Sequence, residues 1–232
     1  MKTKKKVDGH KLMFLHFVAQ RHLWFNNVAL KKYGVFYSSD SIEDEYWNYF
    51  VPENVFMVIR NFDNIKKELS KNKRKSCICL PDFLKNHELL KDEIIEEGYT
   101  CASTESWLVY DNNKPIVIEP MEDVEVIISK DEKTKKDFLE VFIDGYGGAV
   151  TSDSPYGELD KSYVRSLEKS YYEENQVNFI LYYQKVPASV CVLSLVNGYG
   201  AYYGGATKEK YRGKGFNTYI LKHLIIQAHK VG

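Results

Sequence analysis

The sequence predicts an α+β fold in which a mixed central sheet is flanked by helices. Near the C-terminus, Phe216, Ile220 and Leu224 recur every four residues, which is the spacing of the buried side of a helix. Short apolar runs at 177–183 and 188–196 instead have the length and composition of buried strands. Because the 232 residues are 44% hydrophobic, they can form one large or two small domains with apolar cores.

The first 112 residues are expected to form an N-terminal α/β domain. Dense apolar residues from His10 to Lys32 predict a long buried helix with a break near residues 26–27. Further helices are predicted over residues 61–71 and from a cap at Asp82 to about residue 97, where Gly98 ends the helix. Strands are predicted at Val35–Ser38, Tyr46–Val51, Lys75–Leu80 and Ser103–Tyr110, with Val55–Arg60 as a further strand candidate.

A polar turn at residues 111–115 marks the expected boundary, so residues 113–232 form the second predicted domain. Its first helix begins near Lys130 and is expected to stop at the glycine-rich stretch 144–148. A second helix is predicted from about Glu158 to Glu174. The predicted strands are 116–118, 124–129, 177–183, 188–196 and Tyr199–Thr207.

The second domain is organised around the turn between its last strand and its last helix. The strand Tyr199–Thr207 follows a hairpin signal at Asn197-Gly198, and the stretch from Arg212 to Asn217 leads into the final helix. The first backbone N–H groups of a helix have no partner within it, and glycines let a ligand approach the main chain closely. The turn therefore predicts an anion site suited to a phosphate or pyrophosphate, although glycine pairs are also ordinary turn residues.

Two glycines inside the strand, Gly204 and Gly205, distinguish this segment from an ordinary turn. Glycine within a strand weakens it and usually marks a bulge or the close approach of another backbone. A strand with a glycine break, a basic turn and an amphipathic helix, in this order, resembles the acetyl-CoA-binding segment of the GNAT N-acyltransferase superfamily. In the family pattern Arg/Gln-x-x-Gly-x-Gly/Ala, Arg212 and Gly215 match, whereas Asn217 stands at the last Gly/Ala position.

The resemblance covers about residues 122–232 and implies an N-acetyltransferase with acetyl-CoA as co-substrate and no metal. The acetyl group would pass directly to a primary amine in a ternary complex. N–H groups from Gly213 to Asn217 would hold the pyrophosphate, and backbone groups of Gly205 and Thr207 would pair with the pantetheine arm. The implied coenzyme-binding residues are Gly205, Thr207, Arg212, Gly213, Lys214, Gly215, Phe216 and Asn217.

Candidates for the acceptor side lie between the first two helices of the second domain, a junction that lines the acceptor in the family. Acidic groups there would attract a cationic amine. Asp144 is the candidate base and Tyr203 the candidate group facing the thioester, because the strand 199–207 carries no carboxylate. A solvated loop and core packing are ordinary alternative roles. The candidate substrate-binding residues are Tyr146, Asp153 and Tyr156, with Glu158 beside them.

The composition argues against several classes of function. Lys+Arg and Asp+Glu number 32 each, so no net charge attracts nucleic acid or an anionic membrane. No apolar run approaches the roughly 20 residues of a membrane span. The four cysteines lack C-x-x-C spacing, which argues against a metal site and fits a reducing cytoplasm. We therefore expect a cytoplasmic protein whose partner is a small-molecule or peptide amine.

Two other functions fit the same residues. One is a degenerate coenzyme-binding or interaction module without catalysis, which Asn217 and the missing strand carboxylate would suit. The other is an aminoacyl-tRNA-dependent transferase with tandem GNAT-like modules. The neutral net charge and the intact Arg212–Gly215 turn argue against this second function. The order of elements in residues 1–112 resembles the second half of a GNAT domain, so this half is interpreted as degenerate GNAT-like.

The final helix runs to the end of the sequence, whereas the family continues with another strand, a helix and a hairpin. The second domain is therefore predicted to lack its last strands, which would leave an apolar edge at Tyr199–Thr207. We expect either a truncated sequence, or a missing layer supplied by the N-terminal half or by a second copy in a homodimer.

Overall fold

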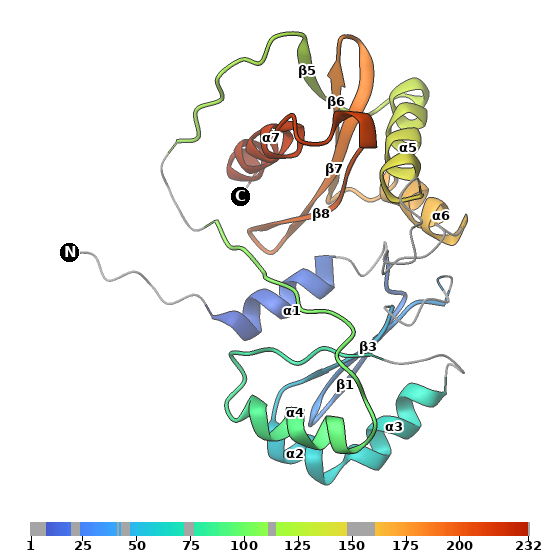
Figure 1. Ribbon diagram of the computed structural model, residues 1–232, viewed down its shortest axis with the longest axis vertical. Helices are drawn as coiled ribbons and strands as arrows, with labels where there is room; N and C mark the ends of the chain where they lie inside the picture. Colours follow the sequence, from blue (N-terminus) through green and yellow to red (C-terminus); the bar gives the residue numbers. More distant parts are fainter. Residues whose placement is uncertain are drawn as a thin grey trace, which may run out of the picture. The chain divides into compact units, whose positions relative to one another are not determined.

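The computed structural model describes residues 8–19, 24–40, 42, 47–71, 77–110, 115–147 and 161–231. The chain divides into two compact units (Figure 1). Unit 1 comprises Met1–Phe17 and Trp24–Lys114, and unit 2 comprises Val18–Leu23 and Pro115–Gly232. Within the described residues, each unit contains a four-stranded sheet with helices packed on it, so the α+β prediction is confirmed.

The sheet of unit 1 has the strand order β1-β2-β3-β4 and is mixed. β1 (Asn27–Lys31), β2 (Gly34–Ser38) and β3 (Asn48–Pro52) are antiparallel, and β4 (Cys77–Ile78) pairs with β3 in parallel. Because residues 27–31 pair with β2, they are not part of a helix, and the prediction of one helix over 10–32 is wrong there. The helix α1 spans only Gly9–Ala19.

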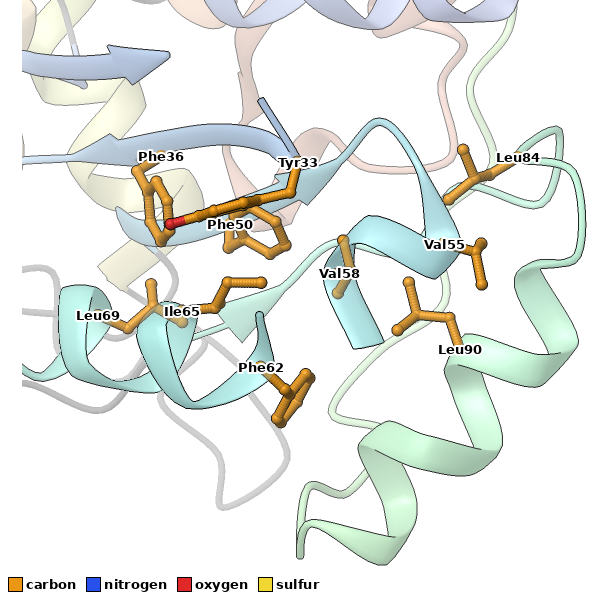
Figure 2. Packing of buried hydrophobic residues seen from close by; sticks show 10 residues of the cluster. All are labelled: Tyr33, Phe36, Phe50, Val55, Val58, Phe62, Ile65, Leu69, Leu84 and Leu90. Carbon is orange, nitrogen blue, oxygen red and sulfur yellow. The ribbon is translucent and has the colours of Figure 1, made fainter. Parts of the chain in front are cut away.

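Three helices cover one face of this sheet: α2 (Val55–Arg60), α3 (Phe62–Ser70) and α4 (His87–Glu96). Figure 2 shows their apolar side chains meeting those of β2 and β3. The candidate strand at 55–60 is wrong, because Asn54 Oδ1 accepts a hydrogen bond from Met57 N at 3.0 Å and so caps a helix. The buried cluster consists of Tyr33, Phe36, Phe50, Val55, Val58, Phe62, Ile65, Leu69, Leu84 and Leu90.

Two further predictions for unit 1 are corrected. The helix expected from Asp82 begins only at His87, after Asn86 in a left-handed conformation with φ 64°, although it ends at Gly98 as predicted. Residues 103–110 form no strand but an exposed irregular segment. Their β-branched and aromatic side chains suit a strand, yet a strand also needs a partner, and none of the described strands pairs with them.

The sheet of unit 2 is antiparallel and follows chain order: β5 (Val124–Ile128), β6 (Gln176–Tyr183), β7 (Val186–Val196) and β8 (Tyr199–Thr207). The predicted hairpin turn at Asn197-Gly198 is confirmed, with φ of 48° and 77°. β6 and β7 are joined by Gln184-Lys185, which also have positive φ values. Both pairs fit two-residue turns that match the twist of the strands they join. The strand expected at 116–118 is wrong, since these residues are irregular.

Helices lie on both faces of this second sheet (Figure 1). α7 (Phe216–Val231) buries its predicted stripe against β6 and β7. α5 (Glu132–Gly147) and α6 (Lys161–Ser170) lie on the opposite face, where Phe142 and Leu167 each have a carbon atom 3.9 Å from a Cβ built on Gly204. α5 ends at Gly147, inside the glycine-rich stretch 144–148 where its end is predicted.

Candidate functional site

The turn between β8 and α7 leaves its main chain open. After β8, a short 3₁₀ helix at Glu209–Tyr211 leads to Gly213 and Gly215, with φ of 78° and 79°. A Cβ built on either glycine would meet no atom within 4 Å, so both face open space. The helix then starts at Phe216, whose side chain is 2% exposed and anchors the first turn in the core. Its first N–H groups therefore lie beside an open surface.

Basic side chains surround this turn. The ammonium of Lys214 lies 5.6 Å from the centre of the Tyr183 ring, and that of Lys210 lies 4.9 Å from the Tyr211 ring. Both contacts have cation–π geometry, which holds a cation near a ring without neutralising it. Together with the helix N-terminus, these two lysines give the turn a positive potential that favours an anion.

Arg212 does not reach into the open space of the turn. Its Nη2 donates to the carbonyl oxygen of Gly145 at 2.8 Å, and its Nε donates to the carbonyl oxygen of Thr207 at 3.3 Å. Gly145 lies in the last turn of α5, where carbonyl groups are unpaired within the helix and carry partial negative charge. Arg212 thus joins the end of α5 to the end of β8.

The end of α5 lies directly against β8. A Cβ on Gly145 would come within 2.8 Å of the Ala206 Cβ and 3.3 Å of the Thr207 nitrogen, so this close packing requires glycine. The next residue is Tyr146, whose hydroxyl group donates to the carbonyl oxygen of Gly205 at 3.0 Å. These contacts hold the last turn of α5 against β8.

Backbone groups of Gly205 and Thr207 point to the edge of β8 that faces away from β7. The main-chain groups of Ala206 and Lys208 are directed toward β7. Ser189 Oγ donates to the Ala206 carbonyl oxygen, and Lys208 N donates to the Ala188 carbonyl oxygen, both at 3.0 Å. Alternate residues of a strand direct these groups to opposite edges. No described strand pairs with this outer edge, where Tyr146 and Arg212 donate to the two carbonyl groups.

A bulge places Gly205 beneath a tyrosine. The register of β7 and β8 shifts between Val190 and Val192, opposite Gly204 with φ 59°, and this confirms the bulge expected from the glycines. The shift puts Tyr202 and Gly205 on the same face, and a Cβ on Gly205 would lie 1.7 Å from the Tyr202 hydroxyl oxygen. A larger residue at position 205 would therefore require the Tyr202 side chain to move.

Asn217, which stands where the family pattern has Gly or Ala, is held by the same tyrosine. The Tyr202 hydroxyl donates to Asn217 Oδ1 at 2.7 Å, joining β8 to the first turn of α7. Burial raises the pKa of Tyr202, so its hydroxyl keeps the proton that it donates. The Asn217 side chain is therefore directed to the strand.

Lys208 is a residue of this site that the sequence analysis missed. Its side chain is 5% exposed, and its ammonium forms an ion pair with Glu140 on α5. One helical turn earlier, Asp137 accepts from Lys133 and from the Tyr182 hydroxyl, each at 2.7 Å. No spacing in the sequence marks Lys208, because a lysine before a turn is usually exposed.

The structure brings some of the predicted chemical groups to the site and not others. Asp144 is an exposed residue of α5, one position before Gly145. Tyr203 is 7% exposed, and its hydroxyl donates to Gln176 at the start of β6, so burial raises its pKa. Its role at a thioester stays a prediction. Asp153, Tyr156 and Glu158 lie outside the described residues.

In the part of the chain that the structure describes, no group of three or more His, Cys, Asp or Glu side chains could hold a metal ion. Among those same residues, no helix combines the length and the hydropathy that crossing a membrane requires.

Known proteins share the fold of this chain. No family model matches the sequence, and no curated protein matches it either. Among solved structures, a GCN5-related N-acetyltransferase from Kribbella flavida matches 94% of this chain and 82% of its own, with a TM-score of 0.66 at 16% identity. A functionally unknown conserved protein from Staphylococcus epidermidis ATCC 12228 matches 89% and 81%, with a TM-score of 0.56 at 12% identity. The chain thus has the fold of the GCN5-related N-acetyltransferases, the GNAT fold.

Proposed function

We propose that this protein is an acetyl-CoA-dependent N-acetyltransferase that moves the acetyl group directly to a primary amine. The observation that carries the proposal is the open turn between β8 and α7. Gly213 and Gly215 present backbone to free space at a helix N-terminus, with Lys210 and Lys214 beside it. The coenzyme pyrophosphate would bind to the N–H groups from Gly213 to Asn217.

The eight proposed coenzyme residues divide into three roles. Gly213, Lys214, Gly215 and the first residues of α7 would contact the pyrophosphate. Arg212 would position the turn through its bonds to Gly145 and Thr207. The outer edge of β8 at 205 and 207 would receive the pantetheine arm, whose amides would bind there in addition to the Tyr146 hydroxyl.

Direct transfer of the acetyl group to the amine requires little covalent chemistry from the protein's own side chains. Holding the amine beside the thioester can supply up to roughly 7–11 kcal/mol of the barrier reduction through proximity alone. A base must also take a proton from the ammonium. We propose Asp144 and Tyr146 for the acceptor side, because both stand at the end of α5 next to the edge of β8. Tyr203 fits a packing role better.

Calorimetric titration with acetyl-CoA tests the coenzyme site, and thiol release over a panel of amines tests the reaction. We expect one coenzyme per chain and release of CoA with at least one amine of the panel. Lys214→Ala should weaken coenzyme binding by about 1 kcal/mol, the scale of an exposed charge contact. No binding at millimolar acetyl-CoA would remove the proposal.

A coenzyme-binding module without catalysis is the second candidate. Two observations favour it: β8 carries no carboxylate, and Tyr146 and Arg212 already donate to the carbonyl groups of its outer edge. This candidate predicts coenzyme binding without release of CoA for any amine. A homodimer and a degenerate GNAT-like unit 1 are further parts of the main proposal, and sedimentation of the protein would decide the first.

A further inference from the structure

Unit 1 contains a cavity that the proposed coenzyme site does not use. It lies between α1 and the face of β2 and β3 opposite to the core of Figure 2, and its volume is about 300 Å³. This volume is at the lower end of the roughly 300–1,000 Å³ found for small-molecule sites. The lining residues are Met13, Phe14, Phe17, Val35, Tyr37, Val51, Pro52 and Glu53.

The walls are apolar and fixed by packing. Met13, Val35 and Val51 are buried. Phe17 stacks on Tyr37 with ring centres 4.4 Å apart, so the roof from α1 and the floor from β2 hold each other in place. Since protein interiors are close-packed, a space of this size between rigid side chains is a place for a ligand body.

Two polar side chains line the cavity, Tyr37 from β2 and Glu53 directly after the end of β3. Tyr37 is 1% exposed and is one of the residues that line the cavity. Its hydroxyl group can donate or accept a hydrogen bond, so it can serve as a polar partner for a ligand there. The Glu53 carboxylate is exposed and, within the described chain, takes part in no ion pair. Burial raises the pKa of Tyr37, and the negative charge of Glu53 adds to this effect.

We propose that this cavity binds a small molecule that joins an apolar alkyl or aryl body to a protonated amine. The body would fill the space between Met13, Phe17 and Val51. The ammonium would donate to the Glu53 carboxylate and to the oxygen of the Tyr37 hydroxyl. A carboxylate at the same place would be repelled by Glu53 and is excluded. Ligand binding in this cavity depends neither on the turn proposed to bind the coenzyme nor on acetyl transfer.

The test compares three probes of one shape on the full chain by calorimetry: 2-phenylethylamine, 2-phenylethanol and 3-phenylpropanoate. The amine should bind most tightly and the acid least. Glu53→Gln keeps shape and removes charge, so it should weaken amine binding about three- to fivefold, as for an exposed ion pair, and leave the alcohol unchanged. Glu96→Gln is the matched control on α4, and it should change none of the three affinities.

Tyr37→Phe supplies a second, independent variant. It keeps the ring stacked on Phe17 and removes the hydroxyl, and it should weaken both the amine and the alcohol about fivefold. Three results would overturn the proposal: no binding of the amine at millimolar concentration, equal affinity for amine and acid, or the same effect of Glu53→Gln and Glu96→Gln on amine binding. If Tyr37→Phe fails to fold, the Glu53 variant with its control still decides.

Discussion

Substituting alanine for Gly215 separates the cost of backbone strain from the loss of a ligand site. Gly215 has φ 79°, and a Cβ there would meet no protein atom within 4 Å. The structural cost is therefore the left-handed conformation alone, about 1–2 kcal/mol for a residue with a Cβ. For a chain of this size that corresponds to a fall in Tm of roughly 2–8 °C. The new methyl group would occupy the space in which the pyrophosphate is proposed to bind.

Gly98 is the matched control, because it too has a positive φ, 89°, and open space around its Cα, but it ends α4 in unit 1. Thermal unfolding and calorimetric titration with acetyl-CoA should be measured for wild type, Gly98→Ala and Gly215→Ala. Both variants should lose similar stability. Only Gly215→Ala should lose coenzyme affinity, by at least about tenfold, or 1.4 kcal/mol. Equal affinity in the two variants would refute the assignment of the turn to the pyrophosphate.

Two other predictions concern α5. Arg212→Lys keeps the charge but lacks the forked guanidinium that donates to both Gly145 and Thr207. The free energy of unfolding, measured by denaturant titration, should therefore fall by about 1 kcal/mol. Unchanged stability would show that these two hydrogen bonds contribute nothing. Asp131 accepts from Thr134 N at 2.8 Å, which lowers the pKa of its carboxyl below the ordinary 3.8. Its contribution is present above that pKa and is lost as the pH falls through the folded value, so Asp131→Asn should flatten the loss of stability in acid, and an unchanged acid limb would contradict this.

The local elements of unit 2 were predictable because the signals lie within a few residues of one another. β8 spans Tyr199–Thr207 as predicted, its glycine bulge is present, and α7 buries Phe216, Ile220 and Leu224. Each feature follows from side-chain period or from the conformational freedom of glycine, which operate without long-range contacts. The open turn between them was predicted on the same basis.

Predictions failed where the outcome depended on a partner far away in the chain. Residues 27–31 are apolar enough for a helix but pair with β2, and residues 103–110 have strand composition but no partner among the described strands. At residues 55–60, the hydrogen bond from Met57 N to the side-chain oxygen of Asn54 favours a helix. In short apolar runs the period does not distinguish helix from strand, so such contacts choose between them.

The sequence by itself determined that this is an α+β protein with a glycine-rich, basic turn at the start of its last helix. Only the tertiary structure decided what the side chains at that turn do. It directs Arg212 to the Gly145 carbonyl, Asn217 to the Tyr202 hydroxyl and Lys208 to Glu140. These partners are 67, 15 and 68 residues apart in the sequence, and their hydrogen bonds form only once β8 has docked between α5 and α7. Long-range polar contacts leave no local pattern in the sequence, because a residue that makes such a contact cannot be told from an exposed residue of the same type.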